Sequence, residues 1–238
     1  QDLTAIRGVE AMRADFVANA SHELRTPLAS LVGFIETLEG PAKDDPAARA
    51  RFLAIMREQA SRMTRVVEDL LSLSKIEMDE HAPPGRTDDV AGLLTAVVEQ
   101  MGPIAAARGV RIGLTTPDAT FAAAGEPDLL EQVFRNLLEN AVKYGREGGE
   151  VRIEAAVVDG QARIRFADDG EGIRAEHIPR LTERFYRVDV ARSRTLGGTG
   201  LGLAIVKHIL IRCRGRLSIE SAIGKGSVFT VWLPPPLD

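Results

Sequence analysis

The stretch Ser21-His22-Glu23-Leu24-Arg25-Thr26-Pro27 lies inside a longer run in which apolar residues recur every three or four positions. Such a period predicts one long amphipathic helix. Pro27 removes the backbone hydrogen bond to the carbonyl of Glu23, which costs a helix roughly 3 kcal/mol. We therefore expect a local function here, because the weakened helix frees a carbonyl and permits a bend where a partner must dock.

The apolar stripe ends at a break formed by Gly40-Pro41 and Pro46, and a second stripe of the same period follows from Phe52 to Ile76. Two such helices with a short connection predict a helical hairpin. A hairpin alone would leave much apolar surface in water. We expect two copies to pair as a symmetric four-helix bundle, which makes the protein a homodimer.

The remainder of the chain alternates between strand and helix patterns. Residues 83–87 open with two prolines and a glycine, which is typical of a linker. We expect helices around 93–98, from Pro127 and over 201–211, and strands over 110–114, near Phe121, and over 151–158, 162–167, 217–220 and 228–233. Asp159-Gly160 predicts a hairpin turn. The predicted fold class is α+β: a helical hairpin over 1–82, the linker, and an α/β sandwich over 88–238.

Composition excludes several classes of function. The chain has 238 residues, 45% of them hydrophobic, and a net charge of -4 without a polybasic block, so we expect no nucleic-acid partner. The single cysteine, Cys213, cannot form an internal disulfide, and no cysteine and histidine cluster has metal-site spacing. No apolar run approaches the ~20 residues that span a bilayer. This piece is expected to be soluble, and its start at Gln1 indicates that it was cut from something longer.

His22 is the first candidate for chemistry. It lies two positions from both Ala20 and Leu24, about 200° around a helix, so we expect its side chain to face solvent. An exposed imidazole can act as a nucleophile if Glu23 takes or holds the proton on one ring nitrogen. The alternative is a surface histidine without a role, and we assign no role to His81, His177 and His208.

Two polar clusters in the second half predict a nucleotide site. Asn136 and Asn140 share one helical face, with Lys143 and Tyr144 one turn further. An asparagine oxygen suits a Mg²⁺ ion that bridges phosphates. The stretch Asp168-Asp169-Gly170-Glu171-Gly172 ends a strand with glycines that allow a ligand to approach, and leaves a carboxylate for a base amino group. Alone, the first could be a polar surface and the second a turn.

A third cluster, Gly197-Gly198-Thr199-Gly200-Leu201-Gly202-Leu203, opens a helix, where free N–H groups attract phosphate. It is neither a Walker loop nor a dinucleotide fingerprint. Arg184, Arg187, Arg192 and Arg194 precede it in a polar stretch that could fold over a triphosphate or remain a solvated loop. Jointly, the three clusters predict a site for ATP and Mg²⁺.

These motifs resemble those of bacterial sensor histidine kinases. Residues 21–27 resemble the family's phosphoacceptor box, 136–144 its asparagine box, 168–172 its first glycine box, 183–187 its phenylalanine box and 198–203 its second glycine box, all in family order. Residues 15–20 and 181–189 further resemble the phosphate-regulon sensor branch. Two departures, the absence of Ile-Phe before Glu183 and Cys213 near a frequent histidine position, lie away from the chemistry.

The resemblance implies a dimeric phosphotransfer bundle joined to an ATP-binding domain of the type shared with gyrase, heat-shock chaperones and mismatch-repair ATPases. By matching positions it assigns His22 as the phosphorylated residue, Glu23 as the base, and Thr26 as the residue that positions water for removing phosphate from the partner. The implied nucleotide-binding positions are Asn136, Asn140, Lys143, Tyr144, Asp168, Gly170, Gly172, Arg184, Arg187, Gly198, Thr199, Gly200, Leu201 and Gly202.

Within that set the resemblance gives Asn140 the Mg²⁺ ion, and Asp168 the adenine amino group. Lys143, Arg184 and Arg187 would meet phosphates, Tyr144 the sugar or phosphate region, and residues 198–202 would anchor a lid.

The implied reaction is ATP-dependent phosphorylation of His22, followed by transfer to an aspartate of a response regulator, with phosphatase action toward that regulator. The chain would be the cytoplasmic portion of an inner-membrane sensor protein that serves signal transduction. Two rivals remain open: an ATPase clamp of the same superfamily, and a scaffold without turnover. Acid-labile, base-stable phosphate on the protein is expected only for the kinase, and an intact fold without ATP turnover would favour the scaffold.

Overall fold

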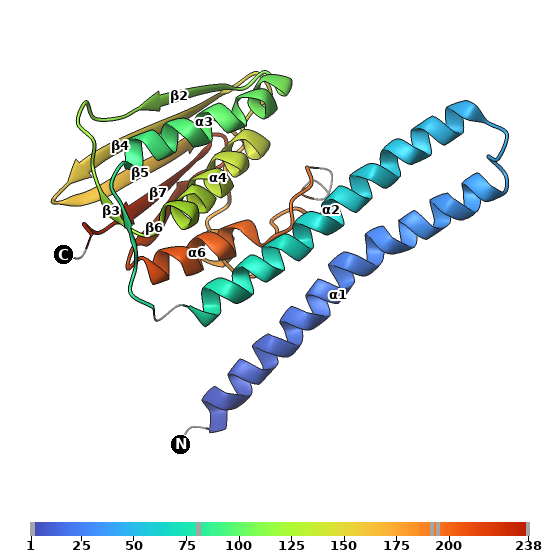
Figure 1. Ribbon diagram of the computed structural model, residues 1–238, viewed down its shortest axis with the longest axis horizontal. Coiled ribbons are helices and arrows are strands. Elements are labelled where there is room, and N and C mark those ends of the chain that lie inside the picture. Colours follow the sequence, from blue (N-terminus) through green and yellow to red (C-terminus); the bar gives the residue numbers. More distant parts are fainter. Residues whose placement is uncertain (1–2, 80–81, 191–192, 194–195, 237–238) are drawn as a thin grey trace. The chain divides into compact units, whose positions relative to one another are not determined.

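The computed structural model describes residues 3–79, 82–190, 193 and 196–236, with side chains described from residue 17 onward (Figure 1). The chain divides into two compact units. The helical unit comprises residues 1–71 and 191–199, and the sheet unit comprises 72–190 and 200–238.

The helical unit is built on a hairpin of two long helices, as the apolar stripes predict. Helix α1 runs over Leu3–Glu39 and helix α2 over Pro46–Met78, the last turns of which belong to the sheet unit. Asp45 caps α2, because its Oδ1 accepts hydrogen bonds from the amides of Ala47 and Ala48 at 2.9 and 3.0 Å. Near this turn Phe34 stacks on Phe52 with ring centroids 5.3 Å apart. The two helices thus pack antiparallel along one apolar seam (Figure 1).

The sheet unit contains a five-stranded sheet covered on one face by three helices (Figure 1). The strands lie in the order β2 (Arg111–Thr115), β4 (Glu150–Val158), β5 (Gln161–Asp168), β7 (Ser227–Leu233) and β6 (Arg216–Ser221). Only β2 and β4 pair in parallel, and the other neighbours are antiparallel. The helices are α3 (Val90–Ala107), α4 (Pro127–Tyr144) and α6 (Gly202–Arg212). A 3-10 turn, η1 (Ile178–Arg180), precedes α6.

The core lies between the three helices and the sheet. Along β5, Ala162, Ile164 and Phe166 are buried while the residues between them are partly exposed, which is the alternation of a strand with one covered face. Phe134 of α4 meets Phe166 with ring centroids 6.1 Å apart. Helix α4 therefore packs over the middle of the sheet, and its polar face carries the asparagine cluster.

Helix α3 is long and apolar, with a mean hydropathy of 1.4 over its 18 residues, and it alone among the described helices meets the length and composition of a membrane span. Its buried residues are Val90, Leu94, Val97, Met101 and Ala105, spaced by three and four. That spacing is typical of a helix with one face in a protein core.

Two details of the sheet unit were tested by the structure. At the turn between β4 and β5, Asp159 and Gly160 have φ of 51° and 76°, which confirms the predicted hairpin. The strand expected near Phe121 is displaced: Phe121 is buried outside any strand, and the short strand β3 is Ala123–Ala124. It pairs with β1 (Arg86–Thr87), which lies in the segment predicted as a linker.

Candidate active site

His22 is exposed on α1, as its helical position predicts. Thr26 lies one turn further along the helix, and its hydroxyl donates to the carbonyl oxygen of His22 at 3.3 Å. The imidazole and the Thr26 side chain therefore belong to the same solvent-facing part of α1, where a reacting group can approach both.

Pro27 lies inside α1, and its side chain is buried. The helix continues on both sides of it, so the proline removes one hydrogen bond to Glu23 without ending the helix. Ser30 donates to the carbonyl of Thr26 at 3.2 Å, so a hydroxyl also bonds the backbone in this turn.

Glu23 forms an ion pair across the hairpin that the sequence did not reveal. Its Oε2 lies 3.0 Å from Nη2 of Arg62 on α2, and the two side chains are only 15% and 12% exposed. Because both are largely shielded from water, the pair is held more firmly than a surface ion pair. One oxygen of the predicted base is thus fixed by a cation from the neighbouring helix.

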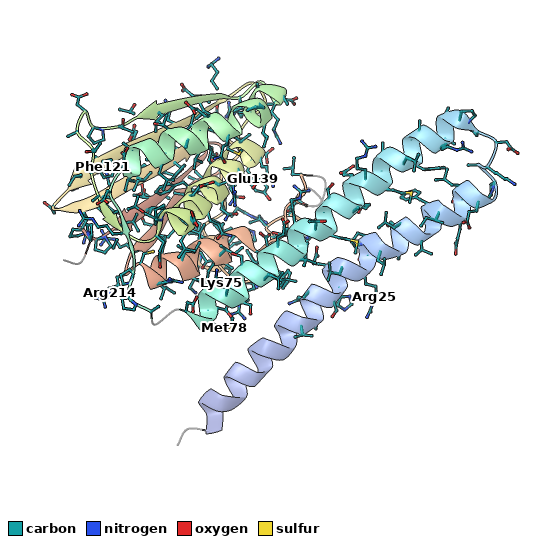
Figure 2. The ribbon with its side chains drawn as sticks, in the orientation of Figure 1. Arg25, Lys75, Met78, Phe121, Glu139 and Arg214 are labelled. Carbon is teal, nitrogen blue, oxygen red and sulfur yellow. The ribbon has the colours of Figure 1, made fainter. Side chains whose placement is uncertain are left out.

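The asparagine cluster lies on α4, as predicted. Asn136 donates from Nδ2 to the carbonyl of Gln132 at 2.9 Å, and Lys143 forms an ion pair of 2.7 Å with Glu139, which Figure 2 labels. Asn140 is partly exposed, and its side chain makes no hydrogen bond with another described residue. Tyr144 is 37% exposed at the end of the helix. Asn136 and Lys143 thus bond within α4, and the amide of Asn140 can accept a ligand.

Asp168 is the last residue of β5, and backbone amides hold its side chain. Its Oδ1 accepts hydrogen bonds from the amides of Gly170 at 2.9 Å and Ser227 at 3.2 Å. Burial raises the pKa of Asp168, the two backbone hydrogen bonds lower it, and the neighbouring charge of Asp169 raises it again, with a raised pKa as the net result. A partly desolvated carboxylate with an anchored oxygen is suited to accept a hydrogen bond from a base.

Two positions of this cluster require glycine because neighbouring backbone segments approach them closely. A Cβ at Gly170 would collide with the carbonyl oxygen of Tyr144, and a Cβ at Gly172, whose φ is 74°, would collide with that of Ala222. The glycines therefore bring the ends of α4 and β5 together with the turn before β7.

Asp169, which was given no role, has a structural one. Its Oδ1 accepts from the amide of Arg146 at 3.3 Å, and its Oδ2 accepts from the amide of Glu150 at 3.1 Å. It ties the connection between α4 and β4 to the end of β5. The sequence signal for this role is that Asp169 directly follows Asp168, at the point where a predicted strand ends in a glycine-rich loop.

The second glycine cluster is divided between the two units. Leu201 is fully buried, so its side chain serves the core, and an added Cβ at Gly202 would lie 2.8 Å from Oδ1 of Asn136. In the helical unit the amide of Gly198 donates to the carbonyl of Ser193 at 2.8 Å, and the hydroxyl of Thr199 donates to Oδ2 of Asp69 at 2.6 Å. Gly200 and Gly202 thus belong to the opening of α6, while Gly198 and Thr199 lie with α2.

Gly200 is locked to Phe185, the centre of the phenylalanine box. The amide of Phe185 donates to the carbonyl of Gly200 at 2.8 Å, and a Cβ at Gly200 would lie 2.9 Å from Cα of Phe185. Both residues have left-handed φ, 62° and 78°. Phe185 is an unusual residue for that conformation, which costs of order 1–3 kcal/mol. The contact fixes the positions from which Arg184 and Arg187, both partly buried, extend.

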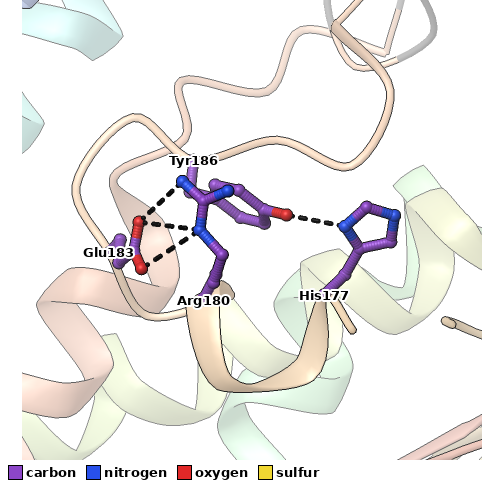
Figure 3. Close-up of polar contacts among 4 residues, drawn as sticks. All are labelled: His177, Arg180, Glu183 and Tyr186. Atoms are coloured by element: carbon purple, nitrogen blue, oxygen red, sulfur yellow. Dashed lines mark hydrogen bonds and ion pairs between the residues drawn. The ribbon is translucent and has the colours of Figure 1, made fainter. Parts of the chain in front are cut away.

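Tyr186 is braced by residues that sequence reasoning missed (Figure 3). Its hydroxyl lies 2.7 Å from Nδ1 of His177, and the guanidinium of Arg180 lies 4.3 Å from its ring centroid. Arg180 in turn forms an ion pair of 3.1 Å with Glu183. No sequence pattern linked His177 to the phenylalanine box, because the contact depends on how the loop folds back. The predicted Arg192 and Arg194 lie outside the described residues.

The raised pKa of Asp168 predicts a pH-dependent gain in stability for Asp168→Asn. In the parent the raised folded pKa contributes stability below the unfolded value of 3.8, and that stability is lost as the pH rises through the folded pKa. In the variant the side-chain amide oxygen can still accept the hydrogen bond from Gly170, but the negative charge is gone. We expect the variant to have a higher melting temperature than the parent near pH 7, and the difference to shrink toward about pH 4.

Thermal unfolding followed by circular dichroism measures this difference. Asp118→Asn, at an exposed loop position, is the control and should show no such trend. A difference that stays constant with pH would contradict the account of Asp168.

Gly170→Ala should destabilise the sheet unit, because the added methyl group meets the carbonyl of Tyr144. Overpacking of this kind costs about 1–3 kcal/mol of unfolding free energy. Urea denaturation gives the value. The control is Gly113→Ala in β2, where a Cβ has no neighbour within 4 Å, and it should change stability by less than about 0.5 kcal/mol. Equal effects of the two substitutions would argue against the close approach.

Two family descriptions match this chain, one over each part. Residues 12–79 match the His Kinase A (phospho-acceptor) domain. Residues 125–237 match the histidine kinase-, DNA gyrase B- and HSP90-like ATPase.

Individual proteins give the same result. The phosphate regulon sensor protein PhoR of Pseudomonas aeruginosa is 44% identical over 235 residues, which are 99% of this chain and 53% of that protein. The chain thus spans about half the length of this relative. The solved structure of the histidine kinase AdeS of Acinetobacter baumannii is similar with a TM-score of 0.70 and 25% identity, over 90% of this chain and 98% of that one.

The structure of the histidine kinase ThkA in complex with the response regulator TrrA has the same fold, with a TM-score of 0.77 and 20% identity over 96% of this chain and 64% of that one. A phospho-acceptor domain followed by a kinase-type ATPase domain, in a chain similar throughout to PhoR, defines one family. The chain therefore belongs to the sensor histidine kinases, with a phospho-acceptor domain and a kinase-type ATPase domain, and it is similar throughout to a phosphate-regulon sensor protein.

Proposed function

We propose that this chain phosphorylates His22 with ATP and passes the phosphoryl group to an aspartate of a response regulator. In the first step a ring nitrogen of His22 forms a bond to the γ-phosphorus of ATP while the bond to the β–γ bridging oxygen breaks and ADP leaves. The proton on the other ring nitrogen is taken or held by Glu23. In the second step the P–N bond breaks and a carboxylate oxygen of the regulator receives the phosphoryl group.

The observation that carries the proposal is the exposed imidazole of His22 inside the segment that matches the phospho-acceptor domain. A phosphoryl donor and a phosphoryl acceptor must each reach this ring from solvent, and a buried histidine could do neither. Thr26, whose hydroxyl lies in the same turn, would orient the water that removes phosphate from the regulator.

The nucleotide site is assigned to the sheet unit. The match of residues 125–237 to an ATPase domain supports ATP as the donor. The partly exposed amide of Asn140 suits a Mg²⁺ ion, and a hard cation of this kind would neutralise phosphate charge during transfer. Asp168 would accept from the adenine amino group, and Gly170 and Gly172 would allow the close backbone approach that forms this corner. Lys143, Arg184 and Arg187 would supply positive charge to the phosphates.

Pairing of two copies is assigned to the helical unit. Its exposed large apolar residues are between 42% and 67% exposed and comprise Val17, Leu28, Val32, Ile35, Leu53, Val67 and Leu71. A second copy would cover these exposed apolar side chains as a four-helix bundle. The receiver domain of the regulator would dock near His22, on the cytoplasmic side of a membrane-anchored sensor.

We also assign the domain limits by function: phosphotransfer and dimerisation to residues 1–82, a linker to 83–87 and nucleotide binding to 88–238. The short pairing of β1 with β3 supports a linker whose end is tied to the second domain.

His22→Ala should abolish phosphorylation of the protein by γ-labelled ATP, because the acceptor nitrogen is lost. Nucleotide binding should stay within about twofold of the parent, since the sheet unit is unchanged. The label on the parent should be acid-labile and base-stable. Ser21→Ala, on the neighbouring exposed position, is the control and should retain the label. A label that survives in His22→Ala would disprove the central assignment.

Asn140→Ala should weaken the binding of ATP with Mg²⁺ by about tenfold or more, which corresponds to about 1.4 kcal/mol. Binding of ATP in EDTA should be nearly unchanged, because only the metal-dependent part is removed. Titration calorimetry with both media separates these contributions. Arg135→Ala, on the exposed face of α4, is the matched control. If the variant binds ATP and Mg²⁺ as tightly as the parent, the metal is held elsewhere.

A further inference from the structure

We propose that Glu77, in the last turn of α2, competes with nucleotide phosphates for Arg184 and so lowers the affinity of the site for ATP. This inference rests on the proposed function, because it takes Arg184 to be a phosphate-binding residue. It adds a residue outside every motif of the sequence analysis, and it concerns how strongly the site binds rather than what reaction it performs.

The competing contact is an ion pair within the sheet unit. Nη2 of Arg184 bonds Oε1 of Glu77, and the two side chains are 28% and 32% exposed. At that burial the charges are less screened than those of a surface pair. A guanidinium bonded in this way offers fewer N–H groups and less net charge to a phosphate, and the carboxylate itself repels the anionic nucleotide. Glu77 therefore lowers the affinity of the site for the polyphosphate.

His208 of α6 makes the competition reversible. Its Nε2 lies 3.5 Å from the same oxygen of Glu77, and its side chain is 18% exposed. When Arg184 turns toward phosphate, this ring remains beside Glu77 and can donate a hydrogen bond from Nε2. The carboxylate is then not left alone in a partly buried place, where an unpaired charge is costly.

The position of Glu77 depends on how the end of α2 packs in the sheet unit. Leu73 and Ile76 are fully buried, and Ser72 exchanges hydrogen bonds of 3.1 and 2.8 Å with Gln132 of α4. Asp79 lies 3.6 Å from Arg212 of α6. Lys75 and Met78, labelled in Figure 2, mark these last turns. These contacts hold Glu77 within the sheet unit, beside Arg184.

A similar contact occurs in the helical unit. There the hydroxyl of Thr199, another predicted nucleotide-site residue, donates to Asp69 of α2 at 2.6 Å. Two predicted nucleotide-site residues, from different sequence boxes, therefore each bond an acid of the same helix. Carboxylates accept from the same donors as phosphates do, which is the chemistry that the proposal requires.

The test measures the dissociation constant of adenylyl imidodiphosphate with Mg²⁺ by titration calorimetry on the whole chain. Glu77→Gln keeps the shape and an acceptor but removes the charge, and it should tighten binding threefold or more. In an Arg184→Ala background the same substitution should have no further effect, since the competed group is absent. Asp79→Asn, which removes a charge from the same helix end, should leave affinity within about 1.5-fold.

Each contrary outcome has one meaning. Unchanged or weaker binding by Glu77→Gln overturns the competition and would make Glu77 a support for Arg184. Tightening that persists without Arg184, or that Asp79→Asn reproduces, overturns the specific role of the pair. If the parent binds no nucleotide while folded, the proposed function itself fails.

Discussion

The sheet unit depends on a close approach of three backbones at the end of β5. Gly170 lies against the carbonyl of Tyr144, Gly172 against that of Ala222, and Gly226 against that of Asp168. No side chain fits at these points, so the end of α4, the end of β5 and the turn before β7 can meet. This meeting places the carboxylate of Asp168 in the same corner as the polar end of α4. The candidate nucleotide site therefore depends on these glycines as much as on its polar side chains.

Two acidic residues with assigned chemical roles are held by different means. Asp168 is fixed by two backbone amides at the end of a strand, where it can move only if the sheet moves. Glu23 is held by the side chain of Arg62 from the neighbouring helix, and both side chains are largely shielded from water. In both cases a carboxylate with a proposed role has one oxygen anchored, by backbone amides in the sheet unit and by a guanidinium in the helical unit.

Much of this arrangement could be predicted from the sequence because it depends on local patterns. The period of apolar residues gave the hairpin, and Asp159-Gly160 gave the turn between β4 and β5. His22 was placed in solvent by counting residues along a helix. The partners of Glu23 and Tyr186 could not be predicted, because Arg62 and His177 approach them only after distant segments pack. The strand near Phe121 was misplaced since a buried aromatic residue was taken for strand pairing.

The hydrogen bond from Phe185 to Gly200 closes the chain between them into a ring. Whatever course the intervening residues take, their two ends stay joined beside the start of α6. The entropy of bringing these two ends together is therefore lost once, on folding. The phenylalanine box and the start of α6 then form one fixed corner of the sheet unit.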